Sequence, residues 1–170
     1  MLNIKNVLGE LTVTKDMVAA EFGCGTADFA VALAQTLQKG KVYALDIQKE
    51  KLSALKGRLL RSHITNVITL LCDLEADHGS TLSDASLDLV LIPNVLFQSE
   101  NRPAIIKEAY RTLKPGGQLL IIDWLKQAHK GHGKHMVSPD EVKTMAADFT
   151  LTLKKEFAAG DYHYALIFIK

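Results

Sequence analysis

This sequence contains little cysteine and almost no surplus charge. Its two cysteines among 170 residues, Cys24 and Cys72, are too few for a disulfide framework, and no CxxC or Cys/His spacing marks a metal site. The 20 Lys and Arg nearly balance the 19 Asp and Glu, which leaves a formal net charge of +1. Because so small a charge gives no general attraction to phosphate backbones, we expect no nucleic-acid partner.

Long apolar runs are missing as well. The N-terminal residues lack the apolar core of a signal peptide, and the longest uncharged apolar stretch, residues 89–97, is too short to span a bilayer. With 48% hydrophobic and 23% charged residues, the composition is that of a globular domain. We therefore expect a cytoplasmic protein without membrane insertion, folded as a single domain over residues 1–170 with no substantial N-terminal cap.

Seven apolar runs bounded by turn residues are predicted strands: residues 17–22, 41–46, 67–72, 87–92, 118–124, 151–157 and 162–169. They alternate with segments of helical period, which indicates the α/β class: a seven-stranded, mainly parallel sheet with helices on both faces. The link between the last two strands is too short for a parallel crossover. These strands are therefore predicted to form a C-terminal antiparallel hairpin.

Apolar stripes at three- and four-residue intervals predict helices at residues 29–37, 52–59 and 105–113. Gly40 is predicted to end the first of these helices, and the Pro-Gly-Gly run at 115–117 the third. Ser138, followed by Pro139 and Glu141, has the pattern of a capping box and predicts a short helix after the fifth strand. Another short helix is expected around residues 6–11, and polar loops are expected at residues 75–84 and 126–137.

A glycine-rich turn, Glu21-Phe22-Gly23-Cys24-Gly25-Thr26-Ala27, lies between the first strand and the helix that follows it. Gly23 and Gly25 permit positive φ angles and a close approach of the backbone to a ligand. The helix directs its free N–H groups and its positive dipole end at the same place. A plain tight turn is the alternative, but the strand–turn–helix context favours a bound polar or anionic ligand.

Acidic residues follow the next two strands. Asp46 ends the second strand, where a carboxylate in this topology accepts hydrogen bonds from both hydroxyls of a ribose. A solvated N-cap of the next helix is the alternative role for Asp46. Asp73 follows the third strand at the same edge of the sheet and is a candidate acceptor for an adenine amino group.

Two adenosine cofactors compete for these features. A nicotinamide dinucleotide carries a pyrophosphate, and Asp28 replaces the third glycine of its GxGxxG fingerprint with an unfavourable negative charge. S-adenosylmethionine carries an adenosine without phosphate and does not need that glycine. The residues therefore favour S-adenosylmethionine, with a nicotinamide-dependent oxidoreductase as the alternative.

Four segments resemble motifs of the class I S-adenosylmethionine-dependent methyltransferases, particularly the small-molecule enzymes related to the quinone-biosynthesis C-methyltransferases. The glycine-rich turn resembles the first motif, residues 42–46 the second-strand motif, and residues 87–96 the fourth strand. The run Tyr-Arg-Thr-Leu-Lys-Pro-Gly-Gly at 110–117 closely resembles the turn before the fifth strand. The resemblance covers about residues 15–145 and implies a Rossmann-like methyltransferase fold. Ala27 departs from it, since many members have glycine there.

The resemblance also implies which residues hold the methionine end of the cofactor. The turn of Gly23, Cys24 and Gly25 would approach it closely, and Glu21 would organise polar contacts to it. The segment at Asn94 would line the cleft beside the methionine amino group.

The adenosine end is assigned in the same way. The resemblance implies that Asp46 holds the ribose hydroxyls and that Ile47 packs on the adenine. Asp73 and the backbone of Leu74 would read the adenine edge.

Other candidate residues follow the fifth strand. His129, His132 and His135 lie in a loop with glycines and lysines, a spacing that does not suit a metal, so no metal site is predicted. Asp123 and Trp124 end the strand at the ligand edge, where an aromatic ring either shapes a substrate pocket, encloses a sulfonium or simply packs.

The sequence thus predicts methyl transfer from S-adenosylmethionine to a small-molecule acceptor, with orientation of the reactants supplying most of the acceleration. No catalytic residue is assigned, although His135 is a candidate base if the acceptor needs deprotonation, and residues 126–137 are a candidate lid. A non-catalytic protein that binds S-adenosylmethionine is a further alternative. The acceptor and the oligomeric state are left open.

Overall fold

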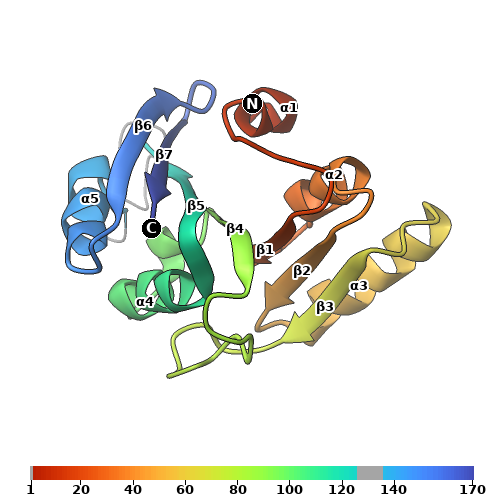
Figure 1. Ribbon diagram of the computed structural model, residues 1–170. Helices are drawn as coiled ribbons and strands as arrows, with labels where there is room; N and C mark the ends of the chain where they lie inside the picture. Colours follow the sequence, from red (N-terminus) through yellow and green to blue (C-terminus); the bar gives the residue numbers. More distant parts are fainter. Residues whose placement is uncertain (1, 126–135) are drawn as a thin grey trace.

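The computed structural model describes residues 2–125 and 136–170 and contains a seven-stranded sheet with the order β3-β2-β1-β4-β5-β7-β6 (Figure 1). The strands are β1 (Val18–Phe22), β2 (Lys41–Asp46), β3 (Val67–Leu71), β4 (Leu87–Pro93), β5 (Leu113–Trp124), β6 (Thr152–Ala158) and β7 (His163–Ile169). All seven predicted strands are present, which confirms the predicted fold class, and β5 begins earlier than expected.

Parallel pairing joins the first five strands. β1 pairs with β2 and β4, β2 with β3, and β4 with β5. β7 lies antiparallel between β5 and β6, which confirms the predicted C-terminal hairpin. Because the chain returns from edge strand β3 to place β4 beside β1, the strand order reverses there. Open α/β sheets bind ligands at the carboxyl ends of the strands beside such a reversal.

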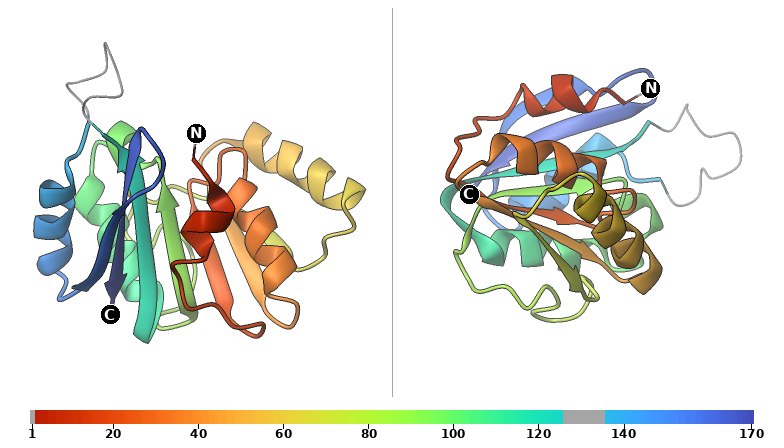
Figure 2. Two further views of the ribbon diagram at one scale, coloured as in Figure 1. Left: turned by 90° about the horizontal axis from the view of Figure 1, so that it is seen from above. Right: turned by 90° about the vertical axis from the view of Figure 1, so that its right-hand side faces the viewer.

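Helices cover both faces of the sheet (Figure 2). They are α1 (Ile4–Leu8), α2 (Asp28–Thr36), α3 (Lys49–Arg61), the 3-10 helix η1 (Leu96–Gln98), α4 (Arg102–Thr112) and α5 (Pro139–Ala147). α1, α2 and α3 contribute to one apolar core, and α4 and α5 to the other. Successive side chains of β4 alternate between the two cores: Leu89 and Leu91 face the first, and Val90 and Ile92 the second. β4 is therefore buried on both faces, as a central parallel strand should be.

Two predicted helix ends are wrong. α2 ends at Thr36, before Gly40, and Gly40 is needed for a different reason: a Cβ there would overlap the backbone carbonyl of Met17. α4 ends at Thr112, and the Pro-Gly-Gly run lies inside β5 because Leu113 already pairs with Leu87 of β4. The register of β4 and β5 shifts just after this pair, so an irregularity absorbs the Pro-Gly-Gly run.

Two short helices have clear N-terminal caps. The capping box predicted at Ser138 is present, with the Ser138 hydroxyl and the Glu141 carboxylate each bonded to the other residue's backbone N–H. α1 begins earlier than predicted, because the side chain of Asn3 accepts a hydrogen bond from the N–H of Asn6 and so caps the helix there.

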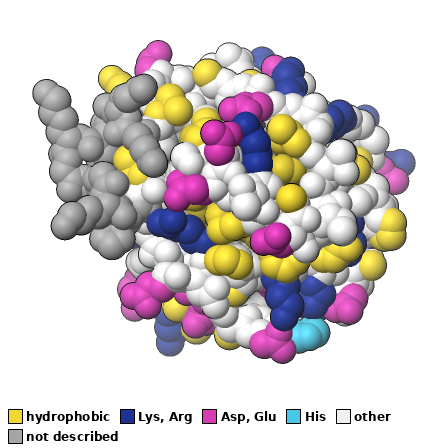
Figure 3. Space-filling view, turned by 90° about the vertical axis from the view of Figure 1, so that its left-hand side faces the viewer, with side chains coloured by type: hydrophobic (Ala, Val, Ile, Leu, Met, Phe, Trp, Pro, Cys, Tyr) yellow, Lys and Arg dark blue, Asp and Glu magenta, His cyan; other side chains and the backbone are white. Residues whose placement is uncertain are grey.

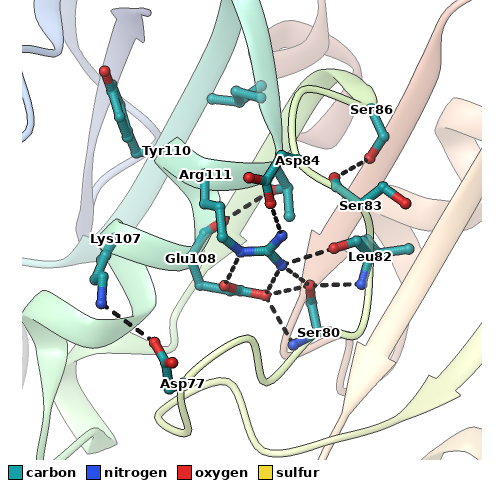
Figure 4. A network of polar contacts seen from close by, with 12 residues as sticks. Asp77, Ser80, Leu82, Ser83, Asp84, Ser86, Lys107, Glu108, Tyr110 and Arg111 are labelled. Atoms are coloured by element: carbon teal, nitrogen blue, oxygen red, sulfur yellow. Dashed lines mark hydrogen bonds and ion pairs between the residues drawn. The ribbon is translucent and has the colours of Figure 1, made fainter.

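The predicted polar loop after β3 is fixed to α4 by buried charges (Figure 4). Arg111 donates to both carboxylate oxygens of Glu108, at 2.8 and 2.7 Å, and also pairs with Asp84. The side chains of Arg111 and Glu108 are only 13% and 4% exposed. Glu108 in turn accepts the backbone N–H of Ser80 at 3.0 Å, so the ion pair holds the loop as well as itself.

The edge formed by β6 carries charges of both signs. Lys143 of α5 pairs with Glu156 of β6 at 2.7 Å and with Asp140 at 3.0 Å. In the view onto this side of the molecule, Lys and Arg side chains are interspersed with Asp and Glu (Figure 3). Charged side chains on an edge strand disfavour pairing with the edge of another sheet.

The predicted loop at residues 126–137 lies mostly outside the described residues, and with it lie His129, His132 and His135. Its last two residues, Met136 and Val137, are buried, and the carbonyl of Val137 accepts a hydrogen bond from the Tyr164 hydroxyl at 3.0 Å. This end of the segment is therefore anchored to β7, whereas a polar loop was expected over the whole of residues 126–137. No helix in the described part of the chain is long and apolar enough to cross a membrane.

Candidate functional site

A cavity of about 610 Å³ lies at the carboxyl ends of β1, β2, β3 and β4. All nine residues predicted to hold the cofactor line it: Glu21, Gly23, Cys24, Gly25, Asp46, Ile47, Asp73, Leu74 and Asn94. Its volume lies within the range of small-molecule sites. The structure thus brings together residues that are spread over more than seventy positions of the sequence.

The glycine turn uses the conformational freedom predicted for it. Gly23 and Gly25 have φ angles of 71° and 51°, in the left-handed region that favours glycine. A Cβ on Gly23 would overlap the side chain of Val95, whereas a Cβ on Gly25 would meet no atom within 4 Å. Gly23 therefore serves packing against the segment after β4, and Gly25 presents bare backbone to open space in the cavity.

Asp46 connects the glycine turn to the end of β2. Its carboxylate accepts the N–H of Gly25 at 2.9 Å through one oxygen and the N–H of Gln48 at 2.9 Å through the other. The bond to Gln48 is a local turn bond ahead of α3, whose N-cap is Gln48 itself, so the alternative role of Asp46 as the N-cap of that helix is wrong. Each carboxylate oxygen can accept a further hydrogen bond, which leaves capacity for a diol in the cavity.

Glu21 is an acid buried beneath the cavity. It is 2% exposed and accepts the backbone N–H of Ala30 in α2 at 2.8 Å. Burial raises the pKa of Glu21 to about 8, and the negative charges of Asp28 and Asp46 push in the same direction. The carboxyl is therefore largely protonated at neutral pH, and a nearby cation would favour its ionised form.

The adenine side of the cavity has one polar and one apolar contact surface. Asp73 is exposed and accepts the N–H of Glu75 at 2.9 Å through one oxygen, and no described residue bonds to its other oxygen. Ile47 is 65% exposed although it lines the cavity, so its apolar surface is available to a flat ring. Leu74 lies beside Asp73 and is buried.

Asn94 contributes a buried polar atom without a partner. Its Oδ1 makes no hydrogen bond to any described residue, although it lines the cavity. The residue has a φ of 54°, which Asn tolerates better than most side chains. Because an unpaired buried oxygen is unfavourable, this atom is a natural acceptor for a ligand's N–H group.

Near the turn, the charge of Asp28 is paired and the two thiols are protonated. Asp28, whose charge counted against a pyrophosphate, is paired with Arg58 at 2.7 Å and accepts the Thr26 hydroxyl at 2.8 Å. Burial raises the pKa of the Cys24 thiol to about 12 and that of Cys72 to about 11. Both thiols are therefore protonated at neutral pH, and the buried Cys24 is suited to packing in the turn rather than to nucleophilic attack.

Sequence reasoning missed several residues of the cavity wall. Leu2 and Ile4 reach it from the N-terminal segment and α1, and Glu75 and Ser99 come from the loops after β3 and β4. The spacing of Leu2 and Ile4 was too short to show a pattern. Glu75 looked like one more residue of a polar loop, and only the fold reveals its partners.

A second cavity of about 810 Å³ adjoins the first. Gln98 and Ser99 line both, and the second is completed by Phe97, Glu100, Arg102, Pro103 and Met145. Asp123 lies nearby, fully buried, and accepts the N–H of Phe97 at 3.1 Å. Trp124 packs against His163 with ring centroids 3.9 Å apart, so ordinary packing is the role that the contacts of Trp124 support.

Comparisons with known proteins agree on the family. The family model described as "Methyltransferase domain" matches residues 13–159. The demethylmenaquinone methyltransferase of Geobacillus stearothermophilus is 31% identical over 124 residues, which are 70% of this chain and 50% of that protein. The enzyme of the same name from Geobacillus sp. (strain WCH70) is 28% identical, with the same shares of the two chains. The chain thus spans about half the length of the curated relatives it matches.

Solved structures share the fold over nearly the whole chain. A SAM-dependent methyltransferase from Aquifex aeolicus has a TM-score of 0.88 at 22% identity, covering 99% of this chain and 89% of the other. The cyclase SpnF has a TM-score of 0.83 at 13% identity, covering 98% of this chain and 79% of its own. At such identities the likeness shows the shared fold alone.

Proposed function

Because this chain belongs to the methyltransferase-domain family, we propose that it binds S-adenosylmethionine in the first cavity and transfers the methyl group to a small-molecule acceptor. Family membership confirms the predicted resemblance to S-adenosylmethionine-dependent methyltransferases, in place of the nicotinamide-dependent alternative. The observation that carries the proposal is the single cavity that joins the glycine turn, Asp46 and Asp73 from three adjacent strand ends.

The residues present fit this cofactor. The open space above Gly25 admits a ligand against bare backbone, and the unpaired Oδ1 of Asn94 is an acceptor for its amino group. Asp46 retains lone pairs for the ribose hydroxyls, and Asp73 has an oxygen for the adenine amino group. Glu21 is a buried acid whose ionised form gains from the cationic methionine end.

When bound, S-adenosylmethionine supplies an electrophilic methyl group on a sulfonium. The chain's own residues fix the two ends of the cofactor, so that the methyl group is held in one orientation toward the acceptor. We place the acceptor in the second cavity, because that cavity meets the first at Gln98 and Ser99. No catalytic base is assigned to the described residues.

Calorimetric titration with S-adenosylmethionine, S-adenosylhomocysteine and NAD tests the cofactor. Both adenosyl ligands are expected to bind and NAD is not; tighter binding of NAD would overturn the proposal. A methyl-transfer screen on small acceptors then separates an enzyme from a non-catalytic binder. Demethylmenaquinone is the first acceptor to screen, since the relatives carry its name. The cytoplasmic location stays a prediction.

A further inference from the structure

The segment from Leu96 to Asn101 forms the wall between the two cavities. Its central residues, Gln98 and Ser99, line both of them. The segment contains the three-residue helix η1 and the N-cap of α4, so its own backbone hydrogen bonds give it little rigidity. Its position must be set by groups from other parts of the fold.

One end of this wall is bonded to Glu75, in the loop after β3. The Glu75 carboxylate accepts the Ser99 hydroxyl at 2.8 Å, the N–H of Glu100 at 3.2 Å and the N–H of Asn101 at 2.9 Å. Three donors from consecutive residues converge on a single carboxylate. Hydrogen bonds to an ionised acceptor are stronger than neutral ones, so Glu75 is a firm anchor.

Asp123, at the end of β5, holds the other end of the wall. Its carboxylate accepts the N–H of Phe97 at 3.1 Å and the N–H of Trp124 at 2.8 Å. Asp123 is fully buried, and its neighbours include Arg102 at the start of α4 and Tyr164 in β7. The backbone of η1 is thereby tied to the rigid central part of the sheet.

We propose that Glu75 and Asp123 are positioning residues that act as a pair, holding the wall segment 96–101 at both ends and so fixing the cofactor cavity against the acceptor cavity. The proposal rests on the proposed function for the identity of the ligands, but the two anchors are features of the free protein. Glu75 also lines the first cavity, and its N–H is bonded to Asp73, so the wall and the adenine-reading loop share one anchor.

Of the two anchors, Asp123 is fully buried, and an experiment can use the effect of this burial on its pKa. Burial raises the pKa of Asp123 to about 6, while bonds from the N–H groups of Trp124 and Phe97 and the charge of Arg102 oppose the rise. Opening the wall to water returns the Asp123 carboxyl toward its ordinary pKa, so the closed wall holds a proton that the open wall releases. The Asp123 end of the wall should therefore loosen as the pH rises through about 6, and an asparagine there should remove this dependence.

The test uses the full chain and the variants Glu75→Gln, Glu75→Ala and Asp123→Asn. Asp77→Ala is the matched control, because Asp77 lies in the same loop as Glu75 and makes an exposed ion pair with Lys107. Amide hydrogen exchange of residues 96–101 in the free protein and the Kd for S-adenosylhomocysteine are measured, with thermal unfolding to verify folding. Exchange is expressed as protection relative to an unfolded peptide at each pH.

Glu75→Ala is expected to lower protection of residues 99–101 and to weaken S-adenosylhomocysteine, each by about tenfold or more, the loss expected for charged hydrogen bonds. The protection and the affinity of Glu75→Gln should lie between those of Glu75→Ala and wild type, because one side-chain oxygen remains as an acceptor. Asp123→Asn should lower protection around Phe97 and abolish its decline between about pH 5 and pH 7. Asp77→Ala should change neither quantity.

The two proposals fail differently. If wild type does not bind S-adenosylhomocysteine, the proposed function falls, while the protection measurements still judge the anchors. If wild type binds but Glu75→Ala and Asp123→Asn leave affinity and protection unchanged, the anchoring role is refuted. Lower melting temperatures with unchanged affinity would also refute it, because they would show a purely structural effect.

Discussion

The Asp46 carboxylate accepts the N–H of Gly25 at 2.9 Å, and this bond joins the end of β2 to the glycine turn that follows β1. The acid proposed to hold the ribose therefore also fixes the backbone proposed to approach the methionine end. Under the proposed function, we expect this contact to couple binding at the two ends of the cofactor, so that a substitution at either residue affects both ends.

Asp46→Ala tests this contact. Loss of charge-assisted hydrogen bonds to the ribose is expected to weaken S-adenosylhomocysteine by about 1.5–3 kcal/mol, measured by calorimetry. The unpaired N–H of Gly25 should also lower the free energy of unfolding, by about 1–3 kcal/mol. Asp77→Ala is the control, because Asp77 has only an exposed ion pair with Lys107. An unchanged Kd in folded Asp46→Ala would contradict the ribose role.

Gly25→Ala and Gly116→Ala form a matched pair. Both glycines have positive φ angles, 51° and 79°, and in both cases an added Cβ meets no atom within 4 Å. The backbone strain of the two alanines should be alike, about 1 kcal/mol in unfolding free energy. Only Gly25 lines the cavity, so only Gly25→Ala should weaken cofactor binding. Equal affinities would show that the space above Gly25 does not hold the cofactor.

Glu21 should make stability depend on pH. Its folded pKa is about 8, above the 4.5 of an unperturbed glutamate, so the folded state holds a proton that the unfolded state releases. Stability is therefore highest below the unfolded pKa and falls as pH rises toward the folded pKa, by at most about 1.4 kcal/mol per pH unit. Urea unfolding between about pH 6.5 and 8 should show this fall in wild type and a smaller one in Glu21→Gln. Equal slopes would rule out a protonated Glu21.

Arg111 should matter more for stability than its neighbour Lys107, although both lie on α4. Arg111→Met removes the partner of a carboxylate that is 4% exposed and should cost about 3–5 kcal/mol in denaturant unfolding. Lys107→Met removes an ion pair whose partners are 62% and 77% exposed, and it should cost less than about 1 kcal/mol. Similar losses for the two variants would mean that the network in Figure 4 does not fix the loop.

Much of the fold could be predicted because the main signals are local. β2 occupies residues 41–46 as predicted, since an apolar run between Gly40 and a helix leaves few alternatives. The hairpin of β6 and β7 followed from the length of one link. The prediction of the end of α4 was wrong because a Pro-Gly-Gly run normally ends a helix or strand. Here, pairing of Leu113 with Leu87 already starts β5 before the Pro-Gly-Gly run. Tertiary pairing overrode the local signal there.

The residues of the candidate site could likewise be predicted only where the signal in the sequence was local. Gly25, Asp46 and Asp73 stand out in the sequence because each lies at or just after the end of a strand at the same edge of the sheet. Glu75 does not stand out, because its partners at Ser99 to Asn101 lie 24 to 26 positions away and two of them are backbone groups. Because almost every residue type has a backbone N–H, a hydrogen bond to the backbone does not constrain the identity of the residue that donates it.

The position of β7 has a consequence for how the chain is made. β5 pairs with β4 on one side, and on the other with β7, which is synthesised last of the seven strands. While β7 is still within the ribosome, the fully buried row from Leu119 to Ile122 lies in an open edge strand. Nascent chains of this protein should therefore expose an unpaired apolar edge strand until β7 has left the ribosome, and a chaperone that recognises extended apolar segments would engage them at β5.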